Sequence, residues 1–167
     1  MIQEKASFYE NPKTELKTNV EFDRTDGKDP KFTDLVKELD EDLQAIYSNE
    51  GYKFDIDIKV DQLNTVVLAS ISEITIGGGC FKPIDAHTAE VKRVFVSPYF
   101  RGLSIGSGLM EEIICWAKEL NFEKLVLETG ELQEQSIRLF KKHGFSVIEN
   151  FGPYVGVKGS ICMGKDL

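Results

Sequence analysis

The chain has 167 residues, with 20 basic against 28 acidic side chains and 41% hydrophobic residues. Domains usually span about 100–200 residues, so we expect a single domain over residues 1–167. The net charge of −8 argues against a nucleic-acid partner, since phosphate neutralisation needs clustered lysine and arginine. No apolar run is long enough to span a membrane, and the opening MIQEKASFYE does not resemble a signal peptide. We therefore expect a cytoplasmic protein with no membrane partner.

Cysteine and histidine usage argues against metal and disulfide chemistry. The three cysteines, Cys80, Cys115 and Cys162, are far apart and form no C-x-x-C pair. Neither His87 nor His143 lies in a set with metal-ligand spacing, so we expect no metal site. Acidic residues are concentrated in the first third of the chain. That excess favours either a cationic substrate such as an amine or simply a solubilising surface.

The first half of the chain predicts one helix and a β-hairpin. Apolar residues recur every three or four positions over 32–47, which predicts an amphipathic helix. Residues 65–70 and 74–81 are rich in β-branched side chains and predict two paired strands. Glycines at 77–79 indicate a bulge or a close backbone approach in the second strand. A weak strand is predicted around 15–22.

The second half of the chain alternates strands with helices. The predicted strands cover 88–97, 124–128, 145–148 and 160–163, and the predicted helices cover 105–120 and 133–143. This order, with the hairpin before it, predicts an α/β fold of three layers, α-β-α, around a mixed sheet.

The turn SPYFRGLSIGSG, at residues 97–108, lies between a predicted strand and a predicted helix. The first amide groups of a helix have no partner within it, and the helix dipole adds partial positive charge there. With Arg101 nearby, the turn predicts an anion site suited to a pyrophosphate. Glycines before a helix can also serve packing alone. The Walker A pattern and the dinucleotide pattern G-x-G-x-x-G are both absent.

Four segments carry a family resemblance. The sequence RGLSIG at residues 101–106 resembles the acetyl-CoA signature [RQ]-x-x-G-x-[GA] of the GCN5-related N-acetyltransferase (GNAT) family. The segments AEVKRVFVSPYFRG, KLVLETG and SIRLFKKHGF resemble that family's fourth strand, fifth strand and last helix, in the same order. The best-matched part covers residues 65–167.

This resemblance implies a sheet splayed at its centre, with acetyl-CoA wedged in the opening as co-substrate. It implies an N-acetyltransferase that moves an acetyl group to a primary amine of a small molecule or peptide by direct attack in a ternary complex. The acceptor's identity and the acyl chain length stay open. So does oligomeric state, although similar proteins often form a homodimer through the C-terminal strand.

The resemblance also implies which residues hold the cofactor. The backbone of 94–96 is expected to hydrogen-bond the pantetheine arm, and the amides of 101–107 to surround the pyrophosphate. Side chains of the last helix are expected to line the cofactor's inner end. The implied cofactor-binding residues are Val94, Phe95, Val96, Arg101, Gly102, Leu103, Ser104, Ile105, Gly106, Ser107, Gln133, Ser136 and Phe140.

Catalytic roles follow from the same resemblance. The N–H of Val96 is the implied oxyanion donor. Glu90 matches a position where a carboxylate removes the proton of the acceptor ammonium. An ion pair between Glu90 and Lys92 or Arg93 is the competing interpretation.

Two residues depart from the family pattern. Ser104 replaces a signature glycine, which weakens phosphate affinity if that position requires positive φ. Phe140 replaces the tyrosine that protonates the leaving thiolate, and phenylalanine has no proton to give. Tyr154 either supplies that proton or lines the acceptor pocket, unless it is an ordinary edge-strand tyrosine. The missing hydroxyl also motivates an alternative function, a catalytically weak acyl-CoA-binding or sensing domain.

Overall fold

A computed structural model describes residues 19–47 and 59–167, so the predicted strand at 15–22 falls partly outside the described residues. A seven-stranded mixed sheet runs through them in the order β1-β2-β3-β4-β5-β7-β6. The strands are β1 Glu21–Thr25, β2 Val66–Ile71, β3 Ile74–Pro83, β4 Thr88–Val96, β5 Lys124–Gly130, β6 Ser146–Val147 and β7 Ser160–Asp166. The helices are α3 Pro30–Tyr47, α4 Ile105–Glu119 and α5 Glu134–Lys142.

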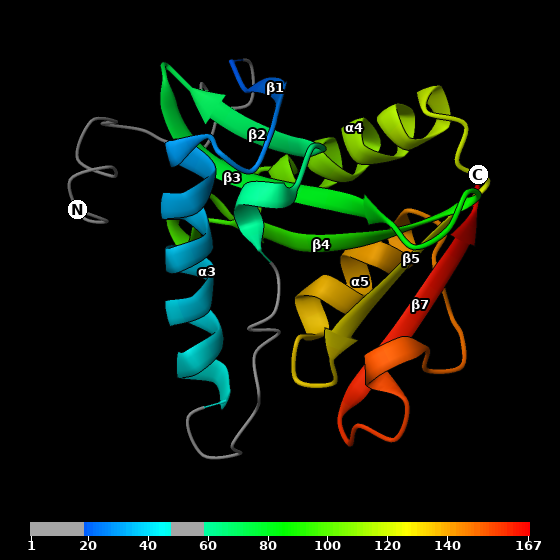
Figure 1. Ribbon diagram of the computed structural model, residues 1–167. Coiled ribbons are helices and arrows are strands. Elements are labelled where there is room, and N and C mark those ends of the chain that lie inside the picture. The colour runs from blue at the N-terminus through cyan, green and yellow to red at the C-terminus, as the bar shows by residue number, and fades with distance from the viewer. Residues whose placement is uncertain (1–18, 48–58) are drawn as a thin grey trace.

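Helices cover both faces of this sheet, which confirms the predicted three-layer α/β fold (Figure 1). Side chains of β2 alternate between the two faces because successive residues of a strand point in opposite directions. Val66 and Leu68 pack in one apolar cluster with Phe32 and Leu35 of α3. On the other face, a larger cluster contains residues of β2, α4 and α5, namely Val67, Ala69, Ile71, Leu109, Ile113 and Phe140.

The predicted hairpin is confirmed, since β2 and β3 pair antiparallel. The first strand begins later than predicted, at Glu21, and it pairs with β2 at the edge of the sheet. The glycines of β3 serve close approach. A Cβ at Gly78 would lie 2.7 Å from Leu35 of α3, and one at Gly79 would lie 3.1 Å from Ile113 of α4. These glycines therefore let both helix layers pack closely against the centre of the sheet.

A bulge lies opposite these glycines, in β4. Between Gly78 and Cys80 the register of β3 advances by two residues, whereas β4 advances by three, from Phe95 to Lys92. The extra residue falls at Arg93 or Val94, and Arg93 has φ 58, a left-handed conformation rare for a bulky side chain. The bulge thus redirects the second half of β4.

Beyond this point β4 and β5 part. They pair in parallel only over Thr88–Val91 and Lys124–Leu127. After Val91 neither strand pairs with the other, and β5 stays bonded to β7 along its whole length. Figure 1 shows β5 and β7 diverging from β4. The centrally splayed sheet that the resemblance implies is therefore present.

Candidate active site

A cleft of about 620 Å³ occupies the opening between the parted strands. Its walls are α3, the last residues of β4, the loop before α4, and α5. All of the predicted cofactor residues except Leu103 and Phe140 line it. Leu103 instead packs against the main apolar cluster, because it is the large apolar side chain of an otherwise small and polar loop. Phe140 lines a separate inner cavity, described below.

The loop before α4 exposes backbone amides to the cleft. Gly102 has φ 82 and Ser104 has φ 66, so both adopt the left-handed conformation that turns the chain into the helix. The N–H of Gly108 donates to Ser104 O at 3.1 Å, the first bond of the helix. The three preceding amides, at Ile105, Gly106 and Ser107, therefore have no acceptor within the helix. Ser104 occupies a position that does require positive φ, so the departure noted in the sequence carries a conformational cost.

The polar groups of Val96 face the cleft. Ser97 N–H donates to Ile76 O of β3 at 2.9 Å, so the neighbouring Val96 has its N–H and C=O on the opposite edge, toward β5. That carbonyl accepts a hydrogen bond from Arg101 Nε at 2.9 Å. An unpaired strand edge of this kind can receive an extended ligand as an additional strand.

Arg101 is fixed by the protein itself. Its second contact is an ion pair with Asp42 of α3 at 2.9 Å, and its guanidinium lies over the Phe95 ring at 5.4 Å. Arg101 therefore joins α3 to the loop and shapes the wall of the cleft. Its charge is partly balanced by Asp42.

A cation that the sequence reasoning missed lies on the opposite wall. Lys142 of α5 donates from Nζ to Ser107 Oγ at 2.9 Å, across the cleft, and Lys142 and Arg138 both line it. Arg138 pairs with Glu134 one turn earlier at 3.0 Å. The spacing of Gln135, Arg138 and Lys142 places them on one helical face, a signal that would have predicted this wall.

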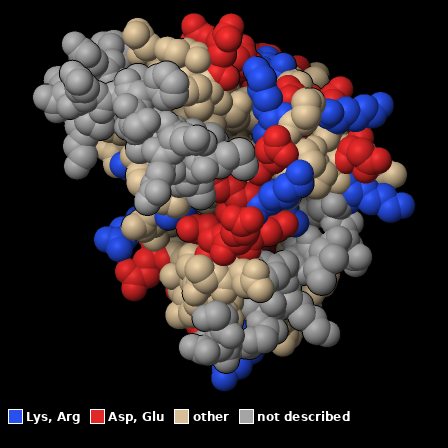
Figure 2. Space-filling view, turned by 90° about the vertical axis from the view of Figure 1, so that its left-hand side faces the viewer, with Lys and Arg blue, Asp and Glu red and all other residues tan. Residues whose placement is uncertain are grey.

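The helix α3 is rich in acidic residues, but the residues with which it lines the cleft are Leu39, Asp42, Leu43 and Ile46. Figure 2 views the molecule from the side on which α3 lies in Figure 1, and acidic side chains gather in the centre of that face. Two acidic residues of α3 pair with arginines that line the cavities, Asp40 with Arg93 at 2.8 Å and Asp42 with Arg101 at 2.9 Å. The acidic residues of α3 are Asp34, Glu38, Asp40, Glu41 and Asp42. The acidic charge therefore lies beside the cleft as well as on the outer surface.

An inner cavity of about 100 Å³ continues the cleft to the point where β4 and β5 part. The two spaces are adjacent, because five residues line both of them, namely Leu39, Leu43, Val94, Gln133 and Ser136. The inner cavity contains the predicted catalytic residues Glu90 and Tyr154 together with Phe140. Its other polar side chains are Lys92, Arg93, Glu128 and Thr129.

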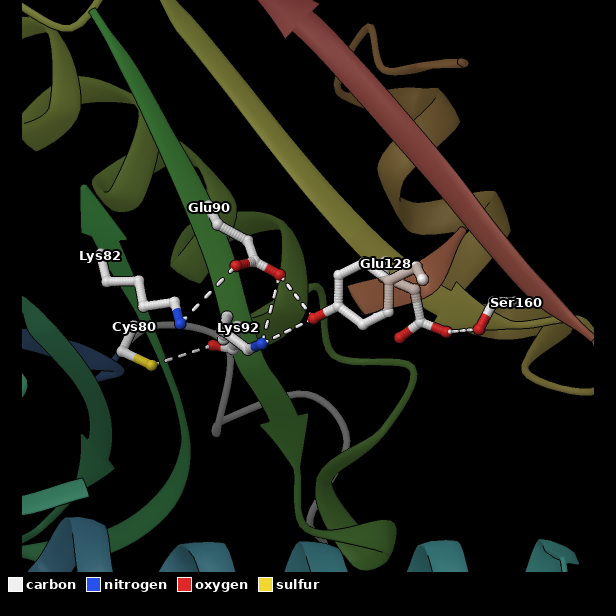
Figure 3. A network of polar contacts seen from close by, with 7 residues as sticks. Cys80, Lys82, Glu90, Lys92, Glu128 and Ser160 are labelled. Carbon is white, nitrogen blue, oxygen red and sulfur yellow. Dashed lines mark hydrogen bonds and ion pairs between the residues drawn. The ribbon is translucent and has the colours of Figure 1, made fainter. Parts of the chain in front are cut away.

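Three buried polar side chains form a closed triangle here. Tyr154 Oη donates to Glu90 Oε1 at 2.7 Å, and Lys92 Nζ donates to Tyr154 Oη at 2.7 Å and to Glu90 Oε1 at 3.2 Å. Lys82, on the neighbouring strand β3, approaches the other carboxylate oxygen at 3.9 Å. Figure 3 shows Lys82, Glu90 and Lys92 directed toward one another. The predicted ion pair between Glu90 and Lys92 is thus present, in contact with the cavity.

Tyr154 is not an edge-strand residue, so that alternative is wrong. It ends a short 3-10 turn at Gly152–Tyr154, its residue is 9% exposed, and its ring packs edge-on against Phe151 at 5.4 Å. The turn is held because Asn150 Nδ2 donates to the carbonyls of Tyr154 and Ser160, at 3.1 and 3.2 Å. The phenol thereby reaches the cavity from the chain between β6 and β7.

The cavity also contains a polar atom without a protein partner. The Oγ1 of Thr129 is buried and has no hydrogen bond among the described residues. Glu128 beside it accepts from Ser160 Oγ at 2.6 Å. A buried hydroxyl that lines a cavity without a partner is suited to bind a ligand.

Cysteine chemistry is disfavoured at this site. Cys80 is fully buried, and its thiol donates to Lys92 O at 3.2 Å. Burial raises the pKa of Cys80 to about 12, and burial likewise raises the pKa of Cys162. Both thiols therefore stay protonated near neutral pH and are poor nucleophiles.

Comparison with known proteins agrees with this geometry. The profile of the Acetyltransferase (GNAT) family matches residues 32–145. A relative from Azospirillum brasilense, named IAA acetyltransferase, is 32% identical over 151 residues, which cover 89% of this chain and 99% of the relative. No helix in the described ranges is long and apolar enough to cross a membrane.

Solved structures share the fold. A Streptococcus agalactiae acetyltransferase has a TM-score of 0.73 at 22% identity, over 90% of this chain and 99% of its own. A GNAT family acetyltransferase from Elizabethkingia anophelis, solved with acetyl-CoA bound, has a TM-score of 0.64 at 21% identity, over 90% and 99% of the two chains. A splayed sheet, an amide-lined loop and an inner polar cavity thus occur in a chain that matches acetyltransferases along most of its length.

Proposed function

This chain belongs to the GNAT family of acetyltransferases, and on that premise we propose that it transfers an acetyl group from acetyl-CoA to a primary amine of a small molecule or peptide. The amine attacks the thioester directly, in a ternary complex. The observation that carries the proposal is a pair of adjacent cavities, one lined by the loop before α4 and the other by the buried Glu90–Lys92–Tyr154 triangle.

The outer cleft is suited to hold the coenzyme. The three amides of Ile105–Ser107 and the positive end of the α4 dipole would bind the pyrophosphate, and Lys142 would add a charge-assisted hydrogen bond from the opposite wall. The edge of β4 beyond Val91, which β5 does not cover, would pair with the pantetheine arm through the backbone near Val94. This arrangement directs the thioester toward the inner cavity.

The inner cavity is suited to the acyl transfer itself. Glu90 would take a proton from the acceptor amine, a contribution of about 10²–10⁴-fold for a well-placed base. The N–H of Val96 would stabilise the oxyanion of the tetrahedral intermediate, because it is fixed by the sheet before the substrate arrives. The acidic side chains of α3 beside the cleft favour a cationic acceptor.

Tyr154 is a candidate for the proton donor that Phe140 cannot be. Phe140 is buried against Phe145 and offers no proton, and Tyr154 places a phenol in the same cavity. We therefore assign protonation of the leaving thiolate to Tyr154. The alternative of a weak acyl-CoA-binding or sensing domain rested on a missing proton donor, and Tyr154 removes that argument for it.

Direct transfer is favoured over an acetyl-cysteine intermediate. The high pKa of Cys80, about 12, and its bond to a backbone carbonyl leave no thiolate near the cavity from that residue. Initial rates with both substrates varied should therefore give intersecting reciprocal plots, whereas a ping-pong pattern would contradict this proposal.

The proposed function is tested by release of coenzyme A thiol from acetyl-CoA in the presence of an amine panel. The panel should include polyamines, amino acids, aminoglycosides and peptide N-termini. IAA should be added because the Azospirillum brasilense relative is named IAA acetyltransferase. We expect turnover with at least one primary amine and an acetylated product by mass spectrometry. Absence of acetyl-CoA binding at millimolar concentration by equilibrium dialysis would refute the proposal.

A further inference from the structure

We propose that Lys92 is a positioning residue that, with Glu90 and Tyr154, forms a closed proton circuit carrying the acceptor amine's proton to the coenzyme A thiolate. This inference rests on the proposed function. It adds a role for a cation that no resemblance implies, and it joins the base and the acid into one unit instead of two independent groups.

The contacts of Lys92 distinguish it from an ordinary ion-pair partner. Its side chain is 8% exposed and that of Glu90 is 6% exposed, so both charges are almost fully removed from water. Lys92 Nζ donates to Tyr154 Oη at 2.7 Å, shorter than its 3.2 Å contact with Glu90 Oε1, and it lies 5.4 Å from the Tyr154 ring centre. Of these two hydrogen bonds of the ammonium, the shorter is the one to the phenol oxygen.

The positions along β4 bring the groups to one face. Glu90 and Lys92 are two residues apart in the strand, so both side chains lie on the side from which Tyr154 approaches. The next residue, Arg93, takes part in a different contact, with Asp40 of α3 at 2.8 Å. The bulge begins after Lys92, so Lys92 is directed to the Tyr154 phenol whereas Arg93 is directed to α3.

A phenol needs help to protonate a thiolate. Free thiols have pKa values near about 8.5 and free phenols near about 10, so this transfer is unfavourable by about 30-fold without an environment that favours the phenolate. An ammonium that donates to the phenol oxygen stabilises the negative charge left when its proton departs. It also keeps the oxygen in place when the hydroxyl hydrogen turns from Glu90 toward the sulfur.

The step balances without a further reactant. An acceptor that arrives as an ammonium first loses one proton to solvent. The neutral amine nitrogen then forms a bond to the thioester carbon, and the carbon–sulfur bond breaks with its electron pair going to sulfur. Glu90 takes one proton from the nitrogen, and Tyr154 gives its hydroxyl proton to the thiolate. The protonated Glu90 then returns a proton to the Tyr154 phenolate over the 2.7 Å contact. Glu90, Lys92 and Tyr154 finish in their starting protonation states.

Lys82 provides a matched control. It is also a lysine paired with Glu90, at 3.9 Å, but it lies on β3 and its side chain is 44% exposed. Among the residues that the structure describes, Lys82 pairs with Glu90 Oε2, whereas Lys92 contacts Oε1 and the phenol. A role limited to balancing the charge of Glu90 would be shared by both lysines.

The test compares Lys92→Met, Lys92→Arg, Tyr154→Phe and Lys82→Met in the thiol-release assay, with an amine that the wild type acetylates. We expect Lys92→Met and Tyr154→Phe to lower kcat by about 30-fold or more, with KM for acetyl-CoA within about threefold of wild type. Lys92→Arg keeps a charged donor and should recover to within about tenfold of wild type. Lys82→Met should lose less than about threefold, and the Lys92→Met/Tyr154→Phe double variant should be no slower than the slower single variant, because the groups act as a unit.

Several outcomes would overturn the circuit. They are a kcat within threefold of wild type for Tyr154→Phe, an equal loss in Lys82→Met and Lys92→Met, or multiplicative losses in the double variant. If Lys92→Met fails to fold, Tyr154→Phe decides alone, since it removes one hydroxyl and keeps the ring contact with Phe151. If the wild type itself acetylates no amine, the proposed function fails, an outcome distinct from a failure of the circuit.

Discussion

The outer cleft and the inner cavity differ in whether backbone or side-chain groups line them. At the outer end, the loop before α4 offers backbone amides, and only Lys142 and Arg138 add cationic side chains from the opposite wall. At the inner end, side chains line the cavity, and Glu90, Lys92 and Tyr154 are hydrogen-bonded to one another. The groups offered by the outer end therefore depend on the backbone conformation, and those offered by the inner end depend on the identity of three side chains.

This difference separates binding from chemistry. Amides that are exposed by a turn and a helix start survive many side-chain substitutions, provided that the backbone can follow the same path. A buried charge triangle tolerates few substitutions, because removal of one partner leaves another charge buried without compensation. Substitutions at the outer end should therefore change affinity or stability in small steps, and those at the inner end should remove turnover.

The largest effect is expected for Glu90→Gln. The amide has the shape of the carboxylate but cannot accept the amine proton, so kcat should fall by about 10²-fold or more. Acetyl-CoA affinity should stay within about threefold by calorimetry. The matched control is Glu119→Gln, because Glu119 pairs with Arg24 and lines neither cavity. Equal kcat losses in the two variants would contradict a base at Glu90.

The second effect is on folding rather than on turnover. A Cβ at Gly108 would overlap with the Phe22 ring, so Gly108→Ala should lower the free energy of unfolding by about 1–3 kcal/mol. In Gly106→Ala, the atom nearest to the added Cβ is a Leu139 methyl carbon at 3.2 Å, the end of a flexible side chain. The free energy of unfolding should therefore fall by less than about 1 kcal/mol. Urea unfolding of both variants measures this. A larger loss in Gly106→Ala than in Gly108→Ala would contradict this account of the two glycines in the first turn of α4.

The third effect is on affinity. Lys142→Met removes a cation from the outer wall, and we expect the Kd for acetyl-CoA to rise about tenfold, equivalent to about 1.4 kcal/mol. The kcat at saturating acetyl-CoA should not change. Lys141→Met is the control, since Lys141 is exposed and lies outside the cleft lining. An unchanged Kd in Lys142→Met would restrict the outer end to backbone contacts.

The smallest effect is expected at the left-handed residue Ser104. Ser104→Gly relieves a positive φ that costs a residue with a side chain about 1–2 kcal/mol. Glycine also raises the conformational entropy of the unfolded chain, which lowers the free energy of unfolding by about 0.4–1 kcal/mol. The net gain in unfolding free energy should be about 1 kcal/mol or less, with acetyl-CoA affinity equal or slightly higher. Gly102→Ala, with open space but φ 82, should change stability in the opposite direction. A stability loss in Ser104→Gly would mean that the hydroxyl has a role in the loop.

The sequence predicts the outer end well for a physical reason. Helix periodicity, paired strands and a small-residue turn are local patterns, and they locate α4, α5, β3 and β4 within a few residues. The glycines indicate a bulge or close approach in β3, and β3 does bulge against β2, with Ile76 as the extra residue between Thr75 and Gly77. The second bulge, in β4, is visible only in the register opposite Gly79.

The inner end was predictable only as a set of candidate residues. Tyr154 contacts Glu90 although 64 positions separate them, and a 3-10 turn with no periodic signal brings it there. No spacing rule indicates that Lys92 donates to that phenol. The burial of Leu103 and the position of Lys142 depend likewise on which face of the loop or helix meets its neighbours.

The short parallel contact between β4 and β5 has one more consequence. Only four residue pairs join the strands β1–β4 to the strands β5–β7 within the sheet. The two halves of the sheet therefore share few backbone hydrogen bonds, although one apolar core packs against both of them. A ligand bound in the opening would add contacts to both halves. A tightly held occupant should make the protein more resistant to heat and to proteases than the empty protein, because it binds only the assembled form.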